Sequence, residues 1–310
     1  MERYLLRRLL QGVAVLWLLT VIVFVISRLS GNPVDLLLPE GAPPSQRTAM
    51  IHELGLDRPL PVQYLTFLRH ALHGDFGRSI RFQTGAASLV LSHMPATIEL
   101  ALAALALAVV IGIPLGVMAA LFRGRFLDYA TTTLLAIGQA VPSFWLAILL
   151  ILWLGVDLHV LPIGGRSGFE SLIMPAVTLS IVPLVTIARI TRASVSSVLP
   201  QDYVRTAEAK GLRRFTVLRR HVLRNGLIPV VTVGGIAMGQ LLSGAVITEQ
   251  IFTWPGIGWL TIQAIEARDY AVVQAVTLLT AAIIVGLNLL VDFLYFSLDP
   301  RIRDAQTASG

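Results

Sequence analysis

The order of apolar and charged positions divides the chain into six long uncharged stretches separated by charged segments. Each stretch runs between two consecutive charged residues and contains at least 18 residues. Because a helix needs roughly 20 mostly apolar residues to cross a bilayer core about 30 Å thick, each stretch predicts one membrane-spanning helix. The stretches are Leu9–Ser27, Leu100–Phe122, Tyr129–Val156, Ser171–Ala188, Asn225–Thr248 and Tyr270–Val291.

The remaining long segment, from Ser30 to Glu99, is interrupted by charged residues throughout and predicts a loop domain outside the bilayer. The first apolar run resembles a secretory signal, but at 19 residues it exceeds the apolar region of about 7 to 15 residues that signals have. We therefore expect a retained helix. The expected parts are residues 1–29 (N-terminus and first span), 30–97 (external loop domain), 98–300 (the other five spans, with a cytoplasmic loop at 189–227) and 301–310 (tail).

Composition supports a membrane protein. Of 310 residues, 55% are hydrophobic and 14% are charged, whereas soluble domains carry about 25% charged residues. This excludes a soluble enzyme core, and the absence of cysteine excludes disulfides, thiolate metal sites and cysteine nucleophiles. The net charge of +6 does not indicate nucleic acid binding, because arginines that hold loops in the cytoplasm explain it.

Basic residues on alternate sides of the six stretches fix the orientation. Sixteen lie on the side that holds both chain ends, and seven lie on the other side with at least as many acids. Positively charged loops are retained in the cytoplasm. We therefore expect a multi-pass membrane protein with both termini cytoplasmic.

Several chemistries are missing from the sequence. The only lysine, Lys210, precedes Gly211 and belongs to no phosphate-binding loop, so no ATPase activity is expected of this chain. The six stretches hold no Asp, Glu or His, which ion-coupled carriers usually place inside the membrane; the nearest, Asp292, is interpreted as an interfacial acid. His70, His73 and Asp75 have a spacing compatible with a metal, but a solvated helix is the preferred interpretation.

The segment from Arg189 to Arg224 predicts two short helices around Gly211. Asp202 is expected to cap the first helix, and Gly211 to end it in the left-handed conformation that this position requires. The first helix, rimmed by Arg205 and Lys210, is expected to slot a small-residue face into another protein's groove. That face is Tyr203, Val204, Thr206, Ala207 and Ala209, and the expected apolar stripe of the second helix is Phe215, Val217, Leu218 and Val222. The alternative is a connecting loop whose arginines serve only to retain it in the cytoplasm.

The run Asp202–Leu212 (DYVRTAEAKGL), followed by His221–Pro229 (HVLRNGLIP), resembles the cytoplasmic coupling loop of ABC importer permeases of the dipeptide, oligopeptide and nickel group. Importer loops in general begin Glu-Ala-Ala, where this chain has Arg205-Thr-Ala, and Arg224 stands where a proline is usual; both departures are typical of this group. The resemblance covers almost the whole chain. Further matches are Gly31-Asn-Pro33, Leu54–Tyr64, Gly74–Ser79, Pro95–Leu100, Phe252–Gly258, Arg268-Asp-Tyr270 and Leu298–Arg303, with Ala271 replacing a usual proline.

This resemblance implies an all-α polytopic fold of six transmembrane helices, the ABC importer type I permease fold, with a periplasmic loop domain between helices 1 and 2. The large first loop points to the B-type subunit. The resemblance further implies a non-enzymatic permease for di- or oligopeptides in the bacterial inner membrane, with residues 98–300 as the permease core. The implied partners are a second related permease, two ATPase subunits that bind ATP and Mg, and an external substrate-binding protein, with no cofactor in this chain. The implied ATPase-coupling residues are Arg205, Thr206, Ala207, Glu208, Ala209, Lys210, Gly211 and Leu212.

Two alternatives remain at the level of sequence. Nickel, metal-chelate and glutathione importers share these motifs, and a self-sufficient carrier or channel would use Gln139, Gln240 and Asp292. Gln139 and Gln240 are costly to leave facing lipid, so they are expected either to line the translocation path or to bond across helices. Within the spans, Pro114, Pro142 and Pro183 favour kinks, and the pair Gly112 and Gly116 favours close helix packing.

Overall fold

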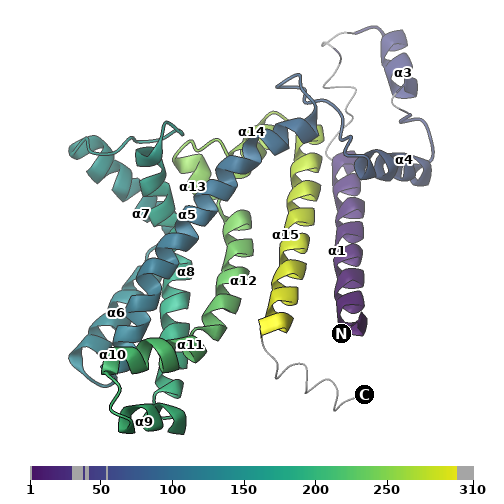
Figure 1. Ribbon diagram of the computed structural model, residues 1–310. Coiled ribbons are helices and arrows are strands. Elements are labelled where there is room, and N and C mark those ends of the chain that lie inside the picture. Colours follow the sequence, from purple (N-terminus) through teal and green to yellow (C-terminus); the bar gives the residue numbers. More distant parts are fainter. Residues whose placement is uncertain (1, 30–37, 39–41, 54, 299–310) are drawn as a thin grey trace. The chain divides into compact units, whose positions relative to one another are not determined.

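The computed structural model describes residues 2–29, 38, 42–53 and 55–298, and these residues are mostly helical (Figure 1). Within this part of the chain, extended pairing is limited to one bridge between Arg78 and Gly85, so the all-α prediction is confirmed. The helices are α1 (Glu2–Leu29), α3 (Pro44–Glu53), α4 (Leu60–Leu72), α5 (Ala86–Leu121), α6 (Phe126–Ala140), α7 (Ser143–Leu150), α8 (Phe169–Val198), α9 (Asp202–Ala209), α10 (Arg214–Val217), α11 (Leu223–Gly226), α12 (Ile228–Gly244), α13 (Val246–Ile251), α14 (Ile257–Glu266) and α15 (Tyr270–Leu298), with π-helical turns η1 (Ile151–Asp157) and η2 (Leu218–Val222).

The described residues supply four helices that are long and apolar enough to cross a membrane, and two bent pairs that each pass the same test jointly. The single helices are α1, α5, α8 and α15. The first bent pair joins α6 to α7 and η1 at an angle of 93°, and Pro142 stands at the break, where its missing N–H ends the helix. The second pair, with a bend of 52°, leads from α10–α11 into α12. These helices match the six predicted stretches.

Several helix ends lie beyond the predicted limits. The second spanning helix begins at Ala86 and not near Leu100, so the boundary expected at residue 97 falls inside α5. The cause is that Glu99 interrupts the apolar stretch without interrupting the helix, because glutamate is a good helix former; its carboxylate lies 2.6 Å from Arg166. The predicted tail, residues 301–310, lies outside the described residues.

The chain folds into two compact units, Met1–Met94 with Leu260–Leu289, and Pro95–Trp259 with Leu290–Gly310. In the first unit, α1 and α15 run antiparallel. Gly12, in the first half of α1, lies next to Val285, in the second half of α15, since a Cβ built on Gly12 would be 2.7 Å from Cγ1 of Val285. Phe24, near the end of α1, lines the same cavity as Tyr270, the first residue of α15.

In the second unit, α8 is the most buried of the candidate spans and forms the centre of the apolar core. It packs against α5, α6, α7 and α12 (Figure 1). One apolar cluster joins Ala108 of α5, Leu135 of α6 and Val230 of α12 to the α8 residues Leu184–Ala188. Gly112 and Gly116 let α5 approach the α8 backbone closely, since a Cβ on Gly112 would lie 3.0 Å from the carbonyl oxygen of Leu184. The predicted glycine packing is confirmed for this pair.

Adding one methyl group at Gly116 is expected to disrupt this packing. A Cβ there would lie 2.5 Å from the carbonyl oxygen of Ala188 and 2.6 Å from Cβ of Thr191, so the backbone of α8 must move. Overpacking of this kind costs about 1–3 kcal/mol. We expect Gly116→Ala to lower the thermal unfolding midpoint of the detergent-solubilised protein. Gly138→Ala in α6 is the matched control, because its nearest neighbour would be 3.8 Å away; equal midpoints for the two variants would contradict this account.

Candidate functional site

The predicted coupling segment begins where α8 ends. Helix α8 runs on to Val198, and Pro200, which has no N–H to continue the helical bonding, follows in the turn. The short helix α9 then starts at Asp202, with Gln201 and not Asp202 at the N-cap position and no side-chain capping hydrogen bond. The predicted cap at Asp202 is therefore wrong, because this acid already has helical geometry in the first turn.

Helix α9 is anchored to its own chain by one face. Val204 and Ala207 pack in a cluster with Ala120 of α5 and Val195 of α8, together with Val217 and Val222 of the following helix. Ala207 is only 4% exposed. The prediction that Val204 and Ala207 belong to a surface that enters a partner's groove is therefore wrong, because these two side chains hold α9 against the ends of α5 and α8.

The turn after α9 has the predicted glycine geometry. Gly211 has φ +75°, in the left-handed region, and a Cβ built there would meet nothing within 4 Å. Its N–H donates to the carbonyl of Glu208 at 2.9 Å, while the N–H of Lys210 donates to Thr206 at 3.1 Å. Helix α10 starts after Arg213, whose carbonyl accepts from Thr216 at 2.8 Å. The predicted pattern of helix, glycine and helix is confirmed.

The opposite face of this segment is exposed. Arg205, Thr206, Glu208, Ala209, Lys210 and Leu212 are exposed among the predicted coupling residues, as is Tyr203. Phe215 was expected on the buried stripe of the second helix, but its side chain is 72% exposed, whereas Val217 and Val222 are buried. We call Tyr203, Thr206, Lys210, Leu212 and Phe215 the coupling surface. Large apolar side chains exposed beside basic ones are typical of a surface that binds another protein.

A buried carboxylate, which the sequence analysis did not single out, lies in the same unit. Glu249 of α13 is 0% exposed. Its Oε1 accepts a hydrogen bond from Thr97 of α5 at 2.6 Å, and its Oε2 accepts one from the backbone N–H of Trp259 at 3.0 Å. Thr97 in turn accepts from the N–H of Ile257 at 2.8 Å. Glu249 thus connects α5, α13 and the start of α14.

The run Phe252–Gly258 wraps around this carboxylate. A Cβ on Gly256 would overlap the carboxylate of Glu249, and one on Gly258 would lie 3.0 Å from Oε2. The indole N–H of Trp254 donates to the carbonyl of Ala96 at 2.8 Å, which fixes the loop to α5. α13 lies outside the candidate spans, and burial raises the pKa of the Glu249 carboxyl against the opposing effect of its hydrogen bonds.

A second charged contact, also not predicted, joins α6 to α8. Arg192 donates from Nε to Oδ1 of Asp128 at 2.7 Å and from its terminal nitrogen to Oδ2 at 2.9 Å. The N–H of Gly124 donates to the same carboxylate at 3.0 Å. Because a bidentate arginine–carboxylate pair fixes geometry as well as charge, this contact sets the position of the first turn of α6 on α8. The sequence holds one sign of this contact: Asp128 is an acid at the start of a span, three residues after Arg125.

The two glutamines proposed for the translocation path are both exposed on this chain. Gln139 lies one residue before the end of α6, next to the bend at Pro142, and Gln240 lies on α12. Within the described residues neither side-chain amide has a hydrogen bond across helices, so the structure offers no support for that alternative. The path role stays a prediction. The side chain of Asp292 lies outside the described part of the structure.

Family models match both parts of the chain. Residues 112–304 match the binding-protein-dependent transport system inner membrane component, and residues 1–101 match the N-terminal part of the membrane component of the same systems. The chain therefore belongs to the family of inner membrane components of binding-protein-dependent transport systems. The family membership expected from the sequence is confirmed.

Three characterised relatives align over nearly their whole length. The dipeptide transport system permease protein DppB of Escherichia coli is 38% identical over 98% of this chain and 99% of the relative. The di/tripeptide permease DppB of Pseudomonas aeruginosa is 41% identical over 92% and 94%. The oligopeptide permease AppB of Bacillus subtilis is 38% identical over 98% and 100%.

Solved structures share the fold. The MetNI methionine ABC transporter in inward-facing form superposes with a TM-score of 0.54 at 16% identity, covering 68% of this chain and 96% of that one. An amino acid ABC transporter with histidines gives a TM-score of 0.54 at 14% identity, covering 68% and 94%. At these identities the likeness shows the fold alone, which is the importer permease fold expected from the sequence.

Proposed function

We propose that this chain is the B-type permease subunit of an ATP-driven importer of di- or oligopeptides, and that it forms the translocation path together with a second, related permease. The observation that carries the proposal is the full-length similarity to peptide permeases, which extends to 98% of this chain and 100% of the oligopeptide permease AppB. The similarity includes the external segment as well as the spans. It therefore supports the same transport function as these peptide permeases and not only the same fold.

In this proposal the energy comes from two partner ATPases that bind ATP and Mg, because Lys210 is the only lysine and no phosphate-binding loop is present. ATP binding closes the two ATPases. Helix α9 transmits the motion, because Val204 and Ala207 fix it to α5 and α8. The spans then change from inward-open to outward-open, and an external binding protein delivers the substrate. Gln139 and Gln240 face the path formed with the second permease.

Uptake by cells tests the substrate. Cells that lack this chain are expected to lose uptake of a labelled dipeptide or tetrapeptide, and an intact copy should restore it. Nickel ion, a nickel chelate and glutathione are the comparison substrates, because importers of the same family carry them. Loss of nickel or glutathione uptake with normal peptide uptake would contradict the peptide assignment.

Cysteine labelling tests the proposed orientation. The chain has no cysteine, so a single introduced thiol is the only reactive group. A cysteine at Arg58 is expected to react with a membrane-impermeant thiol reagent in intact cells. A cysteine at Arg213 should react only after the inner membrane is opened. The reverse pattern would contradict the arginine distribution on which the orientation rests.

A further inference from the structure

A cavity of about 670 Å³ lies in the first unit, between the end of α1, helix α4, the segment 75–80 and the start of α15. The wall between α1 and α4 is well packed. Thr20 and Tyr64 share a hydrogen bond of 2.8 Å, and the ring of Phe24 lies 5.5 Å from that of Tyr64 and 5.8 Å from that of Phe67. Gln63 fixes the preceding loop through bonds to the carbonyls of Leu56 and Arg58, at 3.0 and 2.6 Å. Hydrogen bonds and ring contacts therefore fix the cavity walls formed by α1, α4 and the loop before α4.

Among the described residues that line the cavity, positive charges outnumber negative ones. Arg28, Arg58 and Arg78 line it together with His70. Asp75 is the single acid among the lining residues that the structure describes, and its carboxylate accepts a hydrogen bond from the N–H of Gly77 at 3.0 Å.

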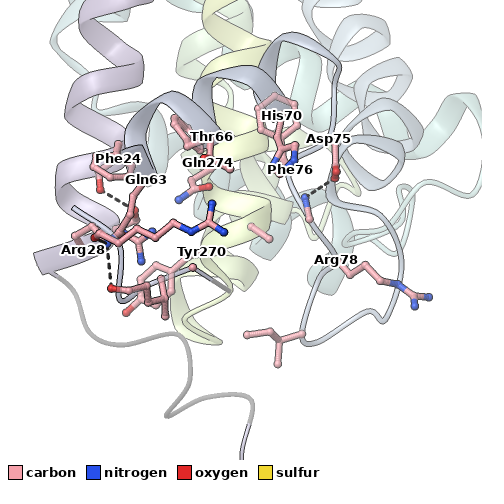
Figure 2. Close-up of a pocket in the computed structure, with 18 residues that line it drawn as sticks. Phe24, Arg28, Gln63, Thr66, His70, Asp75, Phe76, Arg78, Tyr270 and Gln274 are labelled. Carbon is pink, nitrogen blue, oxygen red and sulfur yellow. Dashed lines mark hydrogen bonds between the residues drawn. The ribbon is translucent and has the colours of Figure 1, made fainter. Parts of the chain in front are cut away.

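Arg28 carries one buried donor atom without a partner in the described part of the chain. Its Nε is buried and has no hydrogen-bond partner among the residues that the structure describes. The guanidinium lies 5.3 Å from the centre of the Phe24 ring, and in Figure 2 the side chain lies among those of Gln63, Tyr270 and Gln274. Because Nε is closed to solvent, a ligand in the cavity would reach Arg28, which lines it, through the other nitrogens of the guanidinium.

The position of Arg28 indicates the chemistry of that ligand. Arg28 directly follows the uncharged stretch Leu9–Ser27, so its depth is the edge of the hydrocarbon, where lipid phosphates lie. Trp17, Val25 and Ile26 on the same helix are exposed apolar side chains, which are suited to contact with acyl chains. Arginine binds phosphate through two parallel hydrogen bonds, and the apolar cavity wall at Phe24 and Phe67 accommodates the adjoining glycerol and ester groups.

We propose that this cavity binds the phosphate of an anionic membrane lipid, with Arg28 as its main hydrogen-bond donor. Arg58 supplies further positive charge around the same site, and His70 adds a polar ring. The site is separate from the coupling surface and does not depend on which substrate the importer carries.

Native mass spectrometry of the full-length chain, purified in detergent and supplied with phosphatidylglycerol, tests the proposal. The wild-type chain is expected to retain the lipid, and Arg28→Gln to bind it about tenfold more weakly, because the variant loses a charge-assisted bidentate contact. Arg28→Lys keeps the charge and should fall between the two. Arg69→Gln is the matched control, since Arg69 lies on α4 but does not line the cavity.

The comparison ligands identify the bound group. Diacylglycerol has the same acyl chains without phosphate and is expected not to bind, and inorganic phosphate is expected not to displace the lipid at equal concentration. Equal lipid retention by the wild type and by Arg28→Gln, or equal retention of diacylglycerol, would overturn the proposal. Displacement of the lipid by a dipeptide would also overturn it, because the anion would then be a substrate carboxylate.

Discussion

Gly211→Val is expected to reduce ATP-driven peptide uptake by at least about tenfold while leaving the chain inserted in the membrane. Gly211 has φ +75°, and a β-branched residue in the left-handed region costs on the order of 1–2 kcal/mol. A Cβ there would meet nothing within 4 Å, so the penalty is conformational. The strain is relieved by rotating α9 against α10, which disrupts the coupling surface. Uptake and ATPase co-purification are the measurements.

Gly211→Asn is the matched control for this prediction. Asparagine adopts the left-handed region far more readily than valine, and the space around Gly211 is open. The variant should therefore assemble with the ATPases and transport nearly as well as the wild type. Normal transport by Gly211→Val, or equal losses in the two variants, would show that the turn geometry does not matter for coupling.

The second large effect is expected at the buried carboxylate. Glu249→Ala leaves the hydroxyl of Thr97 and the N–H of Trp259 without their acceptor, in a region where the replaced side chain was 0% exposed. Unpaired buried donors cost about 1–3 kcal/mol each. We expect a loss of roughly 3 kcal/mol, seen as a lower thermal midpoint and a low yield of monodisperse protein in detergent.

Two further variants separate the role of the carboxylate from a general packing effect. Glu249→Gln keeps the shape and one acceptor oxygen, so it should be less damaging than Glu249→Ala. Gly256→Ala should destabilise the protein as well, because its Cβ would overlap the Glu249 carboxylate. A wild-type thermal midpoint for Glu249→Ala would rule out the structural role described for this residue.

The spans could be predicted from the sequence because charge is excluded from hydrocarbon. The same rule gave wrong limits for α5, which begins at Ala86 and continues through Glu99. A charged residue ends an apolar stretch without ending a helix, and the ion pair with Arg166 could not be inferred from a separation of 67 positions. The limits of a helix therefore do not follow from the limits of an apolar stretch.

The backbone conformation of the coupling segment could be predicted from the sequence, but not which of its side chains are buried. Gly211 was assigned the left-handed conformation because a helix end requires it, and φ +75° confirms this. Val204 and Ala207 were placed on the wrong side, since small apolar residues on a short helix fit the chain's own core as well as a partner's groove. Glu249 was missed for a related reason: its acceptor role depends on Thr97, which lies 152 positions away.

Reconstituted transport tests the central claim most directly. Proteoliposomes would contain this chain, the second permease and the two ATPases, with the binding protein and a labelled dipeptide outside and ATP inside. We predict uptake that requires every component and ATP, and no uptake or ATP hydrolysis by this chain alone. Dipeptide uptake by this chain alone, driven by an ion gradient or by the dipeptide gradient without ATP, would contradict the account and identify a self-sufficient carrier or channel.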